Sequence, residues 1–325
     1  MKAIVFDTIG TPSDVLYLSD IKLPEVGDRD VLVKMSASPI IPGDFLFIQN
    51  MYPEPKKPVL PQQTGGNHGC GIVVKTGKNA IIQPGTFVFF TYYNSWAEFA
   101  VVPEEWLISL PPDYSLMKAS QFVNLITALD LVKGSGANKD GWLVLTAGYS
   151  TVSLLAAQFA RDLGIKVISI VRKLKFGDAA ENLHADEVID LSEVGSLKAA
   201  LFELTDQKGI NGVIDNVGGK TMEDLIQATA FGSTVVINGN MSPDNFELHN
   251  NHILFNGLSI RPYIYRYLLS PPKPEDQSFL DEVIHISARE GFEVKIAKVQ
   301  KIEEYREAVS LTLNNSGEGK QVFLF

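Results

Sequence analysis

A short polar turn, residues 147–152, has the composition of a phosphate-binding turn. It follows the apolar run 143–145 and precedes a helical pattern in which Val152, Leu155, Ala156, Phe159 and Leu163 share one face. Free amides and the positive end of the dipole at a helix N-terminus favour a pyrophosphate. The turn residues Ala147, Gly148, Tyr149, Ser150, Thr151 and Val152 are therefore candidate dinucleotide contacts, with Ser150 or Thr151 as the N-cap. Because Gly148 is the only glycine left of a G-x-G-x-x-G pattern, an ordinary strand-helix-strand unit is the alternative.

Two cations, Arg172 and Lys173, follow the next apolar run, residues 166–171. A site selective for NAD usually presents an acidic residue at this strand end, where it holds the ribose hydroxyls. An acid would repel a 2′-phosphate, whereas a guanidinium binds it with two hydrogen bonds. The sequence therefore predicts NADPH rather than NADH as the cofactor. The alternative is a pair of solvated cations at a strand end.

The elements around these residues alternate between strands and helices from about residue 121. Such alternation predicts a doubly wound parallel sheet with right-handed crossovers. The expected strands are 143–145, 166–171, 187–189, 213–215 and 234–237, and the expected helices are 152–163, 176–183, 197–204 and one around 222–226. Gly164 is expected to end the first of these helices.

Residues 1 to about 120 have a different pattern, with short β-like runs separated by Gly and Pro. This pattern predicts an antiparallel, barrel-like domain. The expected strands are 3–6, 31–35, 71–75, 87–90 and 96–102. The tail contains an amphipathic helix over 279–287, a strand near 294, a helix near 305 and a last strand over 321–325, which by pattern alone fit either domain.

Composition excludes several classes of function. The 325 residues, 45% of them hydrophobic, suggest two domains, and a net charge of −10 argues against nucleic acid or an anionic membrane as partner. The single cysteine, Cys70, excludes a disulfide within the chain and a cysteine-rich zinc site. The first residues do not read as a signal or transit peptide, and no stretch approaches the ~20 apolar residues of a membrane span. We expect a cytoplasmic protein acting on a small molecule.

Five patches in order along the chain resemble the medium-chain dehydrogenase/reductase superfamily. They are SPIIPGDFLFIQNMY (38–52), GGNHGCGIVVKTG (65–77), WAEFAVVPEEWL (96–107), the segment 142–173 and DNVGG (215–219). The chain is similar to the zinc-independent branch, which includes quinone oxidoreductases, and especially to its 2-enoyl thioester reductases. The resemblance implies an α/β fold with a GroES-like catalytic domain, 1–120 and 261–325, and a Rossmann NADP-binding domain, 121–260.

The resemblance also implies that zinc is absent. The cysteine and histidine ligands of the zinc-binding relatives would fall at Ile41 and Asn67, neither of which suits the metal. His68 is expected to be structural, because a lone histidine in a glycine-rich turn rarely binds metal. His249 and His252 have the spacing of a ligand pair, but no third ligand lies near them in the sequence.

Tyr52 is the catalytic residue that the resemblance implies, since it follows the Ile48-Gln49 segment as in the thioester reductases. Hydride addition to the β-carbon leaves an enolate, which must be stabilised and protonated at its α-carbon. A phenol can supply that proton, although an unperturbed pKa of about 10 requires a polarising neighbour. The alternative is a loop aromatic packed beside Pro53 and Pro55.

Further cofactor contacts carry over from the family, with simple loop geometry as the alternative for each. They are Thr127, Asn216, Val217, Asn238, Gly239, Asn240 and Met241. Lys320 is expected to be a solvated turn residue. Thr151 and Ser153 stand where the family favours glycine, and their side chains are expected to narrow the approach of the pyrophosphate or the helix packing.

The leading hypothesis is a zinc-independent, NADPH-dependent reductase of an activated C=C bond in an enoyl thioester or an enone. A quinone reductase is the nearest alternative, because a quinone ring needs less acid assistance. A non-catalytic NADPH-binding protein is the alternative from another class, motivated by Thr151 and Ser153. Family members commonly dimerise through an edge strand, and a strand over 255–260 is expected to serve in a homodimer.

Overall fold

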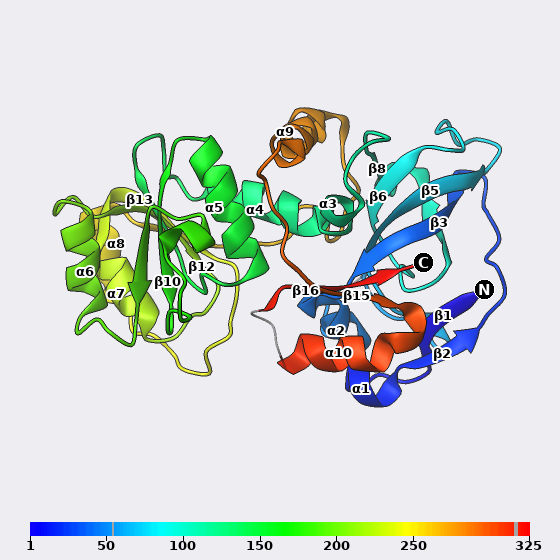
Figure 1. Cartoon of the computed structure of the whole chain (residues 1–325), viewed down its shortest axis with the longest axis horizontal. Helices are drawn as coiled ribbons and strands as arrows, with labels where there is room; N and C mark the ends of the chain where they lie inside the picture. Colours follow the sequence, from blue (N-terminus) through cyan, green and yellow to red (C-terminus); the bar gives the residue numbers. More distant parts are fainter. Residues whose placement is uncertain (54, 315–317) are drawn as a thin grey trace. The chain divides into compact units, whose positions relative to one another are not determined.

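The computed structural model describes residues 1–53, 55–314 and 318–325. The chain divides into two compact units, drawn in Figure 1: unit 1 comprises residues 1–123 and 266–325, and unit 2 comprises residues 124–265. Sequence analysis placed the domain boundaries near residues 120 and 260.

Unit 1 is built mainly from antiparallel strands. Its first part contains β1 (Lys2–Phe6), α1 (Pro12–Val15), β2 (Tyr17–Asp20), β3 (Asp30–Pro39), α2 (Pro42–Ile48), β4 (Gln63–Thr64), β5 (His68–Thr76), β6 (Phe87–Thr91), β7 (Phe99–Pro103), the 3₁₀ helix η1 (Glu104–Trp106), β8 (Leu107–Ser109) and α3 (Leu116–Ser120). The C-terminal part adds η3 (Pro274–Asp276), α9 (Gln277–Ala288), β15 (Ile296–Lys301), η4 (Ile302–Glu304), α10 (Tyr305–Asn314) and β16 (Lys320–Leu324).

The larger sheet of unit 1 joins the two ends of the chain. Its order is β15-β16-β3-β5-β6-β8, and β7 also pairs with β3. β16 runs antiparallel to β3, with Val322 opposite Pro39, so the red C-terminal strand lies beside the blue β3 in Figure 1. The tail therefore belongs with the first 120 residues, a point that its own pattern left open. A smaller sheet, β2-β1-β4, completes the antiparallel domain.

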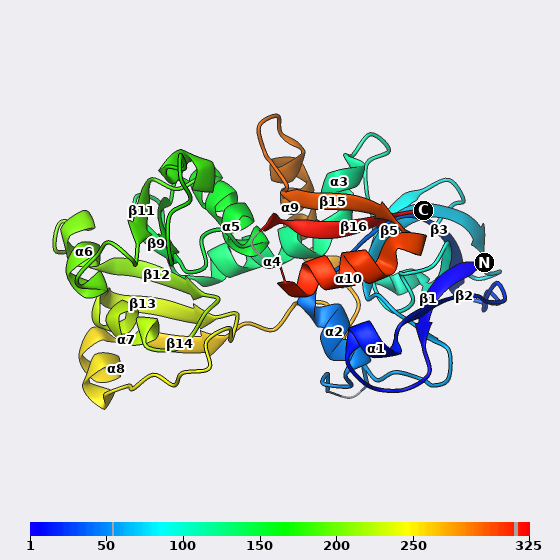
Figure 2. The same cartoon turned by 60° about the horizontal axis from the view of Figure 1, so that its bottom comes forward.

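Unit 2 is a doubly wound parallel sheet. Its strands are β9 (Trp142–Leu145), β10 (Lys166–Val171), β11 (Glu187–Asp190), β12 (Ile210–Asp215), β13 (Thr229–Ile237) and β14 (Ser259–Pro262), in the order β11-β10-β9-β12-β13-β14. This is the strand order 3-2-1-4-5-6 of the dinucleotide-binding fold. Figure 2 shows β12, β13 and β14 side by side.

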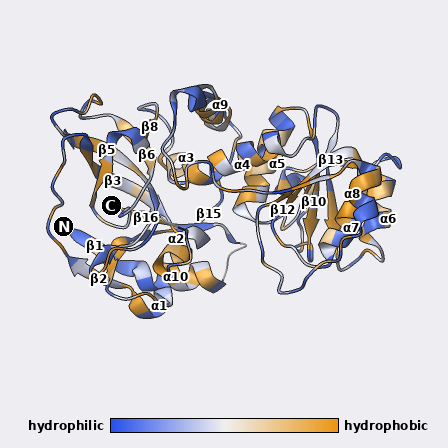
Figure 3. Cartoon of the chain, turned by 180° about the vertical axis from the view of Figure 1, so that it is seen from behind, coloured by the Kyte–Doolittle hydropathy of each residue, from blue (hydrophilic) through white to orange (hydrophobic). Residues whose placement is uncertain are grey.

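Continuous apolar runs explain why these strands lie inside the sheet. Val144, Ile168 and Val213 are fully buried, as parallel strands covered on both faces must be. Figure 3 shows β10 and β12 in the hydrophobic colour. The helices are α4 (Phe122–Gly134), which begins at the border with unit 1, α5 (Thr151–Asp162), the 3₁₀ helix η2 (Ala180–Leu183), α6 (Leu197–Leu204), α7 (Thr221–Gln227) and α8 (Asn250–Asn256). The predicted fold class is confirmed.

Two element predictions were wrong, and the boundary of a third element was displaced. Residues 176–183 contain only η2 at their end, because Gly177 adopts a positive φ of 83° that interrupts a helix. The expected strand over 255–260 is the end of α8 followed by β14, since Gly257 ends α8 in the left-handed conformation. The strand expected near 294 begins at Ile296. Among the described residues, no helix has the length and hydropathy of a membrane span.

Candidate active site

The turn at residues 147–152 lies between β9 and α5, as predicted. Ala147 takes a left-handed φ of 49°, which turns the chain sharply after the strand. Ser150 is the N-cap of α5, and its Oγ accepts a hydrogen bond from the amide of Ser153 at 3.2 Å. The amides of Thr151 and Val152, the first two residues of α5, have no acceptor among the described residues. The turn therefore offers unpaired amide donors at a helix N-terminus.

Ser153, in the first turn of α5, forms hydrogen bonds through its side chain. Its side chain is buried and turned toward the strand ends: Oγ donates to the Thr146 carbonyl at 2.8 Å and accepts from Ser150 Oγ at 2.9 Å. Asn216 Nδ2 donates to the same Oγ at 3.1 Å. The hydroxyl therefore joins α5 to the ends of β9 and β12. That the side chain narrows the phosphate approach or the helix packing stays a prediction.

Asn216 is the centre of a polar network at the carboxyl ends of β9, β12 and β13. Its side chain donates to the Thr146 carbonyl at 3.1 Å and accepts from Asn238 Nδ2 at 2.5 Å. Thr146 Oγ1 accepts from the Asn216 amide at 2.7 Å and donates to buried Asp215 at 2.8 Å. Asp215 also accepts from the Gly218 amide at 2.8 Å. Four side chains from three strand ends thus satisfy one another's hydrogen bonds.

The loops after β12 and β13 are joined by their backbones. The amides of Asn238 and Gly239 donate to the Asp215 carbonyl at 2.8 and 3.2 Å, and the Met241 amide donates to the Val217 carbonyl at 3.0 Å. Asn240 lies in the same loop, and Thr127 is buried on α4. The structure therefore brings together the loop residues that the sequence singled out separately. Their contacts with a cofactor stay predictions.

Arg172 and Lys173 are exposed at the end of β10, as a role in phosphate binding requires. The loop that follows them is held by Tyr149, whose hydroxyl donates to Asp178 at 2.8 Å and accepts from the Lys175 amide at 2.9 Å. The Lys175 ammonium lies 4.8 Å from the centre of the Tyr149 ring. Tyr149 therefore secures the loop that carries the cations.

The geometry of unit 2 fits a dinucleotide. A Cβ on Gly148 would lie 2.2 Å from Ser169 Oγ, so only glycine lets the turn pack this closely on β10. The hydroxyl of Thr151 is buried at the start of α5 and has no hydrogen-bond partner among the described residues. Unpaired amides, a spare hydroxyl and exposed cations together suit the phosphates of NADPH.

In unit 1, Asp44 lies buried in the first turn of α2. Its carboxylate accepts from the amides of Ile41 at 2.9 Å and Asn67 at 2.8 Å, and from Asn67 Nδ2 at 3.1 Å. Burial raises the pKa of Asp44 to about 6, although these hydrogen bonds and the nearby Lys56 favour the charged form. Asp44 thus places a carboxylate whose charge depends on pH in the interior of the unit.

Tyr52 and Lys56 flank Asp44 in the segment after α2. Tyr52 is half-buried, and its hydroxyl lies against Gly43, where an added Cβ would be 2.2 Å from it. Burial, and secondarily the charge of Asp44, raises the pKa of Tyr52. Lys56 is only 4% exposed, and burial lowers its pKa to about 8 against the opposing attraction of Asp44. Within the described residues, neither the Tyr52 hydroxyl nor the Lys56 ammonium has a hydrogen-bond acceptor.

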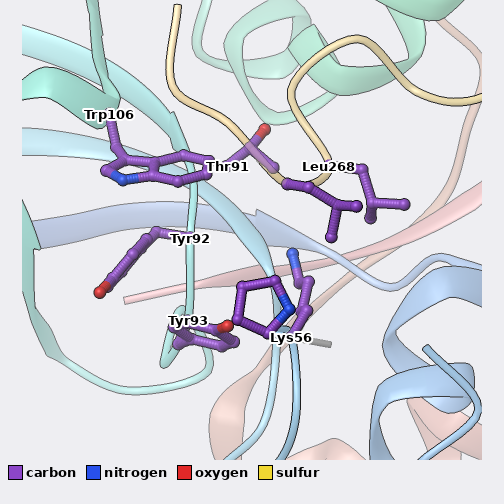
Figure 4. Close-up of a pocket in the computed structure, with 8 residues that line it drawn as sticks. Lys56, Thr91, Tyr92, Tyr93, Trp106 and Leu268 are labelled. Atoms are coloured by element: carbon purple, nitrogen blue, oxygen red, sulfur yellow. The ribbon is translucent and has the colours of Figure 1, made fainter. Parts of the chain in front are cut away.

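A small pocket of about 40 Å³ adjoins Lys56. Figure 4 shows the Lys56 amine pointing toward Leu268, with Tyr93 beside it and Tyr92 and Trp106 across the pocket. The remaining lining residues are Pro55, Thr91 and Leu269. The pocket therefore combines one buried cation with apolar and aromatic walls, as small-molecule sites do.

The positions aligned with zinc ligands do not fit the metal. Ile41 carries a hydrocarbon side chain, and Asn67 is engaged with Asp44. His68 is buried and its Nδ1 lies 3.1 Å from Thr91 Oγ1, while burial and the nearby Lys56 lower its pKa well below the usual value. No group of three or more metal-ligating side chains is found in the part of the chain that the structure describes.

The prediction for Lys320, a solvated turn residue, was wrong. It is the first residue of β16 and half-buried, so it is not a solvated turn residue. Burial lowers its pKa, and the negative charge of Asp44 opposes that shift. Unit 1 therefore gathers two lysines around one buried carboxylate, close to the tyrosine that the sequence singled out.

Sequence reasoning missed Asp44, Lys56, Thr146 and Ser153 as members of these sites. Asp44 had a detectable signal, because an acid three residues after the start of a helix commonly reaches back to the N-cap amide. Lys56 had no such signal in the sequence, because the adjacent Lys57 is a residue of the same type. Only the fold buries Lys56 and leaves Lys57 partly exposed to solvent.

Two family models match the chain. Residues 27–112 match the alcohol dehydrogenase GroES-like domain, and residues 151–281 match the family described as zinc-binding dehydrogenase. The two matched segments fall mainly in unit 1 and unit 2, respectively.

Curated relatives are similar over most of the chain. The mitochondrial enoyl-[acyl-carrier-protein] reductase of Homo sapiens is 31% identical over 272 residues, which cover 81% of this chain and 72% of the relative. The enzyme of the same description from Arabidopsis thaliana is 29% identical over 338 residues and covers all of this chain and 88% of its own length.

Solved structures share the fold. A putative NADPH:quinone reductase from Bacillus thuringiensis has a TM-score of 0.86 at 21% identity, covering 100% of this chain and 98% of that one. The Escherichia coli quinone oxidoreductase complexed with NADPH has a TM-score of 0.85 at 22% identity, and each chain is covered completely.

Proposed function

The chain belongs to the medium-chain dehydrogenase/reductase superfamily and is an oxidoreductase, and we propose that it uses NADPH to reduce the activated C=C bond of an enoyl thioester or an enone. Support for the substrate class comes from the relatives named enoyl-[acyl-carrier-protein] reductases. The observation that carries the proposal is the buried cluster of Asp44, Tyr52 and Lys56, in which two donors lack an acceptor within the described chain.

NADPH, when bound, supplies the hydride. The amides of Thr151 and Val152 would hold its pyrophosphate, and Arg172 and Lys173 would hold its 2′-phosphate. The Escherichia coli structure that shares the fold contains NADPH, which supports this choice of cofactor. Asn216 and Asn238, which shape the loops at the strand ends, would position the rest of the cofactor.

The acceptor must form an enolate when hydride adds to its β-carbon. Tyr52 would then give its phenolic proton to the α-carbon and recover a proton from water. We expected a neighbour that makes this phenol more acidic, whereas burial and Asp44 instead raise its pKa. The phenol therefore stays neutral at physiological pH and can act as a donor only toward a strong base, which an enolate carbon is.

We propose that the reaction proceeds without zinc. The family description includes zinc binding, but Ile41 offers no donor atom and Asn67 is held by Asp44. Carbonyl polarisation must then come from protein donors rather than from a metal.

Stopped-flow oxidation of NADPH and NADH, with a crotonyl thioester and a quinone offered in parallel, tests the proposal. We expect NADPH to be oxidised faster than NADH and the thioester to be reduced. In Tyr52→Phe, thioester reduction should fall at least about 100-fold, the usual scale of a lost proton donor, while quinone reduction should change little.

The same experiment distinguishes the alternatives. Quinone turnover without thioester turnover would favour the quinone reductase, which the structural neighbours support as the second candidate. Equal use of NADH and NADPH would contradict the role of Arg172 and Lys173.

We also propose that the protein is a homodimer that pairs through β14, the edge strand of the unit 2 sheet. Phe231 is 83% exposed, and Leu254 and Phe255 on α8 are each 72% exposed, which leaves an apolar surface on the β13 and α8 side of that edge. Sedimentation equilibrium should give a dimer mass for the wild type, and Phe255→Asp should shift it toward the monomer. A monomeric wild type would contradict this assembly.

A further inference from the structure

Lys56 has the smaller exposed fraction of the two lysines in the cluster. It is 4% exposed, and within the described residues no hydrogen bond or ion pair engages its ammonium group. Its neighbours are aromatic faces: the ammonium lies 5.8 Å from the Tyr52 ring centre and 5.5 Å from that of Tyr93. Such contacts offset only part of the cost of removing an ammonium from water.

The pocket at Lys56 has the size of a functional group rather than of a whole substrate. A single water needs about 10–15 Å³, so a volume of about 40 Å³ has room for a group of a few non-hydrogen atoms. Leu268, Trp106 and Tyr92 form apolar walls, and the Lys56 amine points into the space between them (Figure 4). The pocket suits a planar, uncharged group that carries one oxygen acceptor.

A purely structural role does not explain this arrangement. A packing position would be filled at lower cost by methionine or leucine, because their burial requires no desolvation of charge. Lys57, the next residue, shows the ordinary arrangement, since its ammonium donates to the Asn50 carbonyl at 3.3 Å near solvent. The fold thus holds one of two adjacent lysines in the pocket, where no acceptor for its ammonium lies among the residues that the structure describes.

We propose that Lys56 is a catalytic residue that binds the carbonyl oxygen of the acceptor, the oxygen on which negative charge develops during reduction. This inference rests on the proposed function and specifies how the acceptor lies: its conjugated carbonyl enters the aromatic pocket, and its acyl chain or ring remains outside.

The reduction places negative charge on the carbonyl oxygen, and a group that binds this oxygen stabilises that charge. Hydride carries two electrons to the β-carbon, the π electrons of the C=C bond form the C=C bond of the enolate, and the carbonyl π pair moves to oxygen. NADPH, when bound, would supply these two electrons as the hydride donor. Lys56 holds the resulting oxyanion by a charge-assisted hydrogen bond, and the α-carbon then takes a proton from Tyr52. A quinone develops the same charge on its oxygen, so Lys56 serves both acceptors.

The surroundings of Lys56 set the pH at which it can act. Burial lowers its pKa to about 8, Asp44 is the counter-charge that opposes this, and His68 is kept neutral in the same cluster. Tyr52 and Tyr93 face the ammonium with uncharged rings. Because the charged form binds the oxyanion, acceptor reduction should decline as the pH rises through about 8.

Three variants test the inference. Lys56→Met removes the charge but keeps the length, Lys56→Arg keeps a charge that does not titrate, and Lys57→Met is the matched control. The kinetic readouts are kcat and KM with NADPH for a crotonyl thioester and for duroquinone between pH 6 and 10. Binding of 2-cyclohexen-1-one without cofactor, followed by the fluorescence of Trp106, and the Kd for NADPH complete the set.

We expect Lys56→Met to lose at least about 30-fold in kcat/KM with both acceptors, while Lys57→Met stays within twofold of the wild type. Lys56→Met should also bind 2-cyclohexen-1-one about tenfold more weakly, keep the NADPH affinity and lack the decline near pH 8. Lys56→Arg should regain part of the activity and also lack that decline. A loss of turnover with both acceptors distinguishes the role of Lys56 from that of Tyr52, because Tyr52→Phe should leave quinone reduction nearly unchanged.

Two results would overturn the inference. One is turnover of Lys56→Met within threefold of the wild type with either acceptor. The other is a loss of activity accompanied by an equal loss of NADPH affinity or of thermal stability, which indicates a structural lysine. If the wild type reduces no acceptor, the proposed function fails, and enone binding then decides whether Lys56 still forms a carbonyl site: equal binding by wild type and Lys56→Met rejects it.

Discussion

The polar groups of the two units are buried in opposite ways. In unit 2, the neutral side chains of Thr146, Ser153, Asn216 and Asn238 take part in hydrogen bonds of 2.5–3.1 Å at the strand ends. The one carboxylate of this network, buried Asp215, accepts hydrogen bonds from Thr146 Oγ1 and from the Gly218 amide, both at 2.8 Å. In unit 1, Asp44 and Lys56 carry titratable charges, and the pKa of each is displaced by burial. The charges of unit 2 that matter for the cofactor, Arg172 and Lys173, are exposed instead.

This difference indicates a division of roles. A network in which each buried polar group has a hydrogen-bond partner fixes the loops that must hold a cofactor in one geometry. Desolvated charges are costly to maintain, but they interact strongly with charge that develops in a substrate. Unit 2 therefore has the character of a rigid binding site and unit 1 that of a reactive one.

The largest expected effect concerns the pH dependence of stability set by Asp44. Its folded pKa of about 6 exceeds the ordinary value of 3.8, so the fold prefers the protonated form, and stability should fall as the pH rises from about 4 through 6. The shift corresponds to about 3 kcal/mol at 1.36 kcal/mol per pKa unit. Denaturant unfolding of the wild type and Asp44→Asn at pH 4.5 and 7 measures it. Parallel pH curves for the two proteins would contradict the buried-charge interpretation.

Asn216→Ala disrupts the hydrogen-bond network at the strand ends of unit 2. It leaves Asn238 Nδ2 without its acceptor and removes donors from Thr146 and Ser153, so the unfolding free energy should fall by about 2 kcal/mol. In contrast to the effect at Asp44, the loss should be the same at pH 5 and pH 8. Exposed Asn79→Ala is the control and should change stability by less than about 0.5 kcal/mol.

Arg172→Ala tests whether the exposed charges of unit 2 select the cofactor. The Kd for NADPH should rise about tenfold, a loss of about 1.4 kcal/mol, while the Kd for NADH stays unchanged. Arg161, exposed in the last turn of α5, provides the control, and Arg161→Ala should alter neither affinity. Isothermal titration calorimetry with both cofactors gives the answer, and equal weakening of NADH binding would argue against 2′-phosphate recognition.

Ser153→Ala should have the smallest effect. Thr146 and Asn216 keep their own hydrogen bond of 3.1 Å, so thermal or denaturant unfolding should show a loss of only about 1 kcal/mol. Because the Ser153 hydroxyl forms hydrogen bonds with residues at the strand ends, the affinity for NADPH should stay within twofold of the wild type. A markedly tighter Kd would show that the side chain does obstruct the phosphates.

Much of the fold followed from local pattern. The apolar runs at 143–145, 166–171 and 213–215 identified buried parallel strands, because such strands are covered on both faces and carry continuous hydrophobic sequence. The segment 176–183 failed because its pattern resembled a helix while Gly177 allowed a turn. The tail was ambiguous because a strand near the C-terminus does not reveal its partner, which proved to be β3.

The candidate sites were predictable to different degrees. The resemblance supplied the loop residues of unit 2 as cofactor contacts, and their place after strands agrees with it, because strand ends on one edge of a parallel sheet lie together. Tyr52 was found only through the resemblance. Asp44 and Lys56 depend on which side chains the packing of unit 1 buries.

The sequence by itself determined the superfamily, through its resemblance to known proteins. It also determined most strands and helices and the charged residues proposed to select the cofactor, because these properties reside in local composition and spacing. The tertiary structure alone decided that Lys56 is buried with no hydrogen-bond acceptor among the described residues while Lys57 donates to Asn50 near solvent, and that Ser153 hydrogen-bonds to the strand ends. Burial and hydrogen-bond partners arise from segments distant in the chain, so neighbouring residues of one type can receive opposite environments.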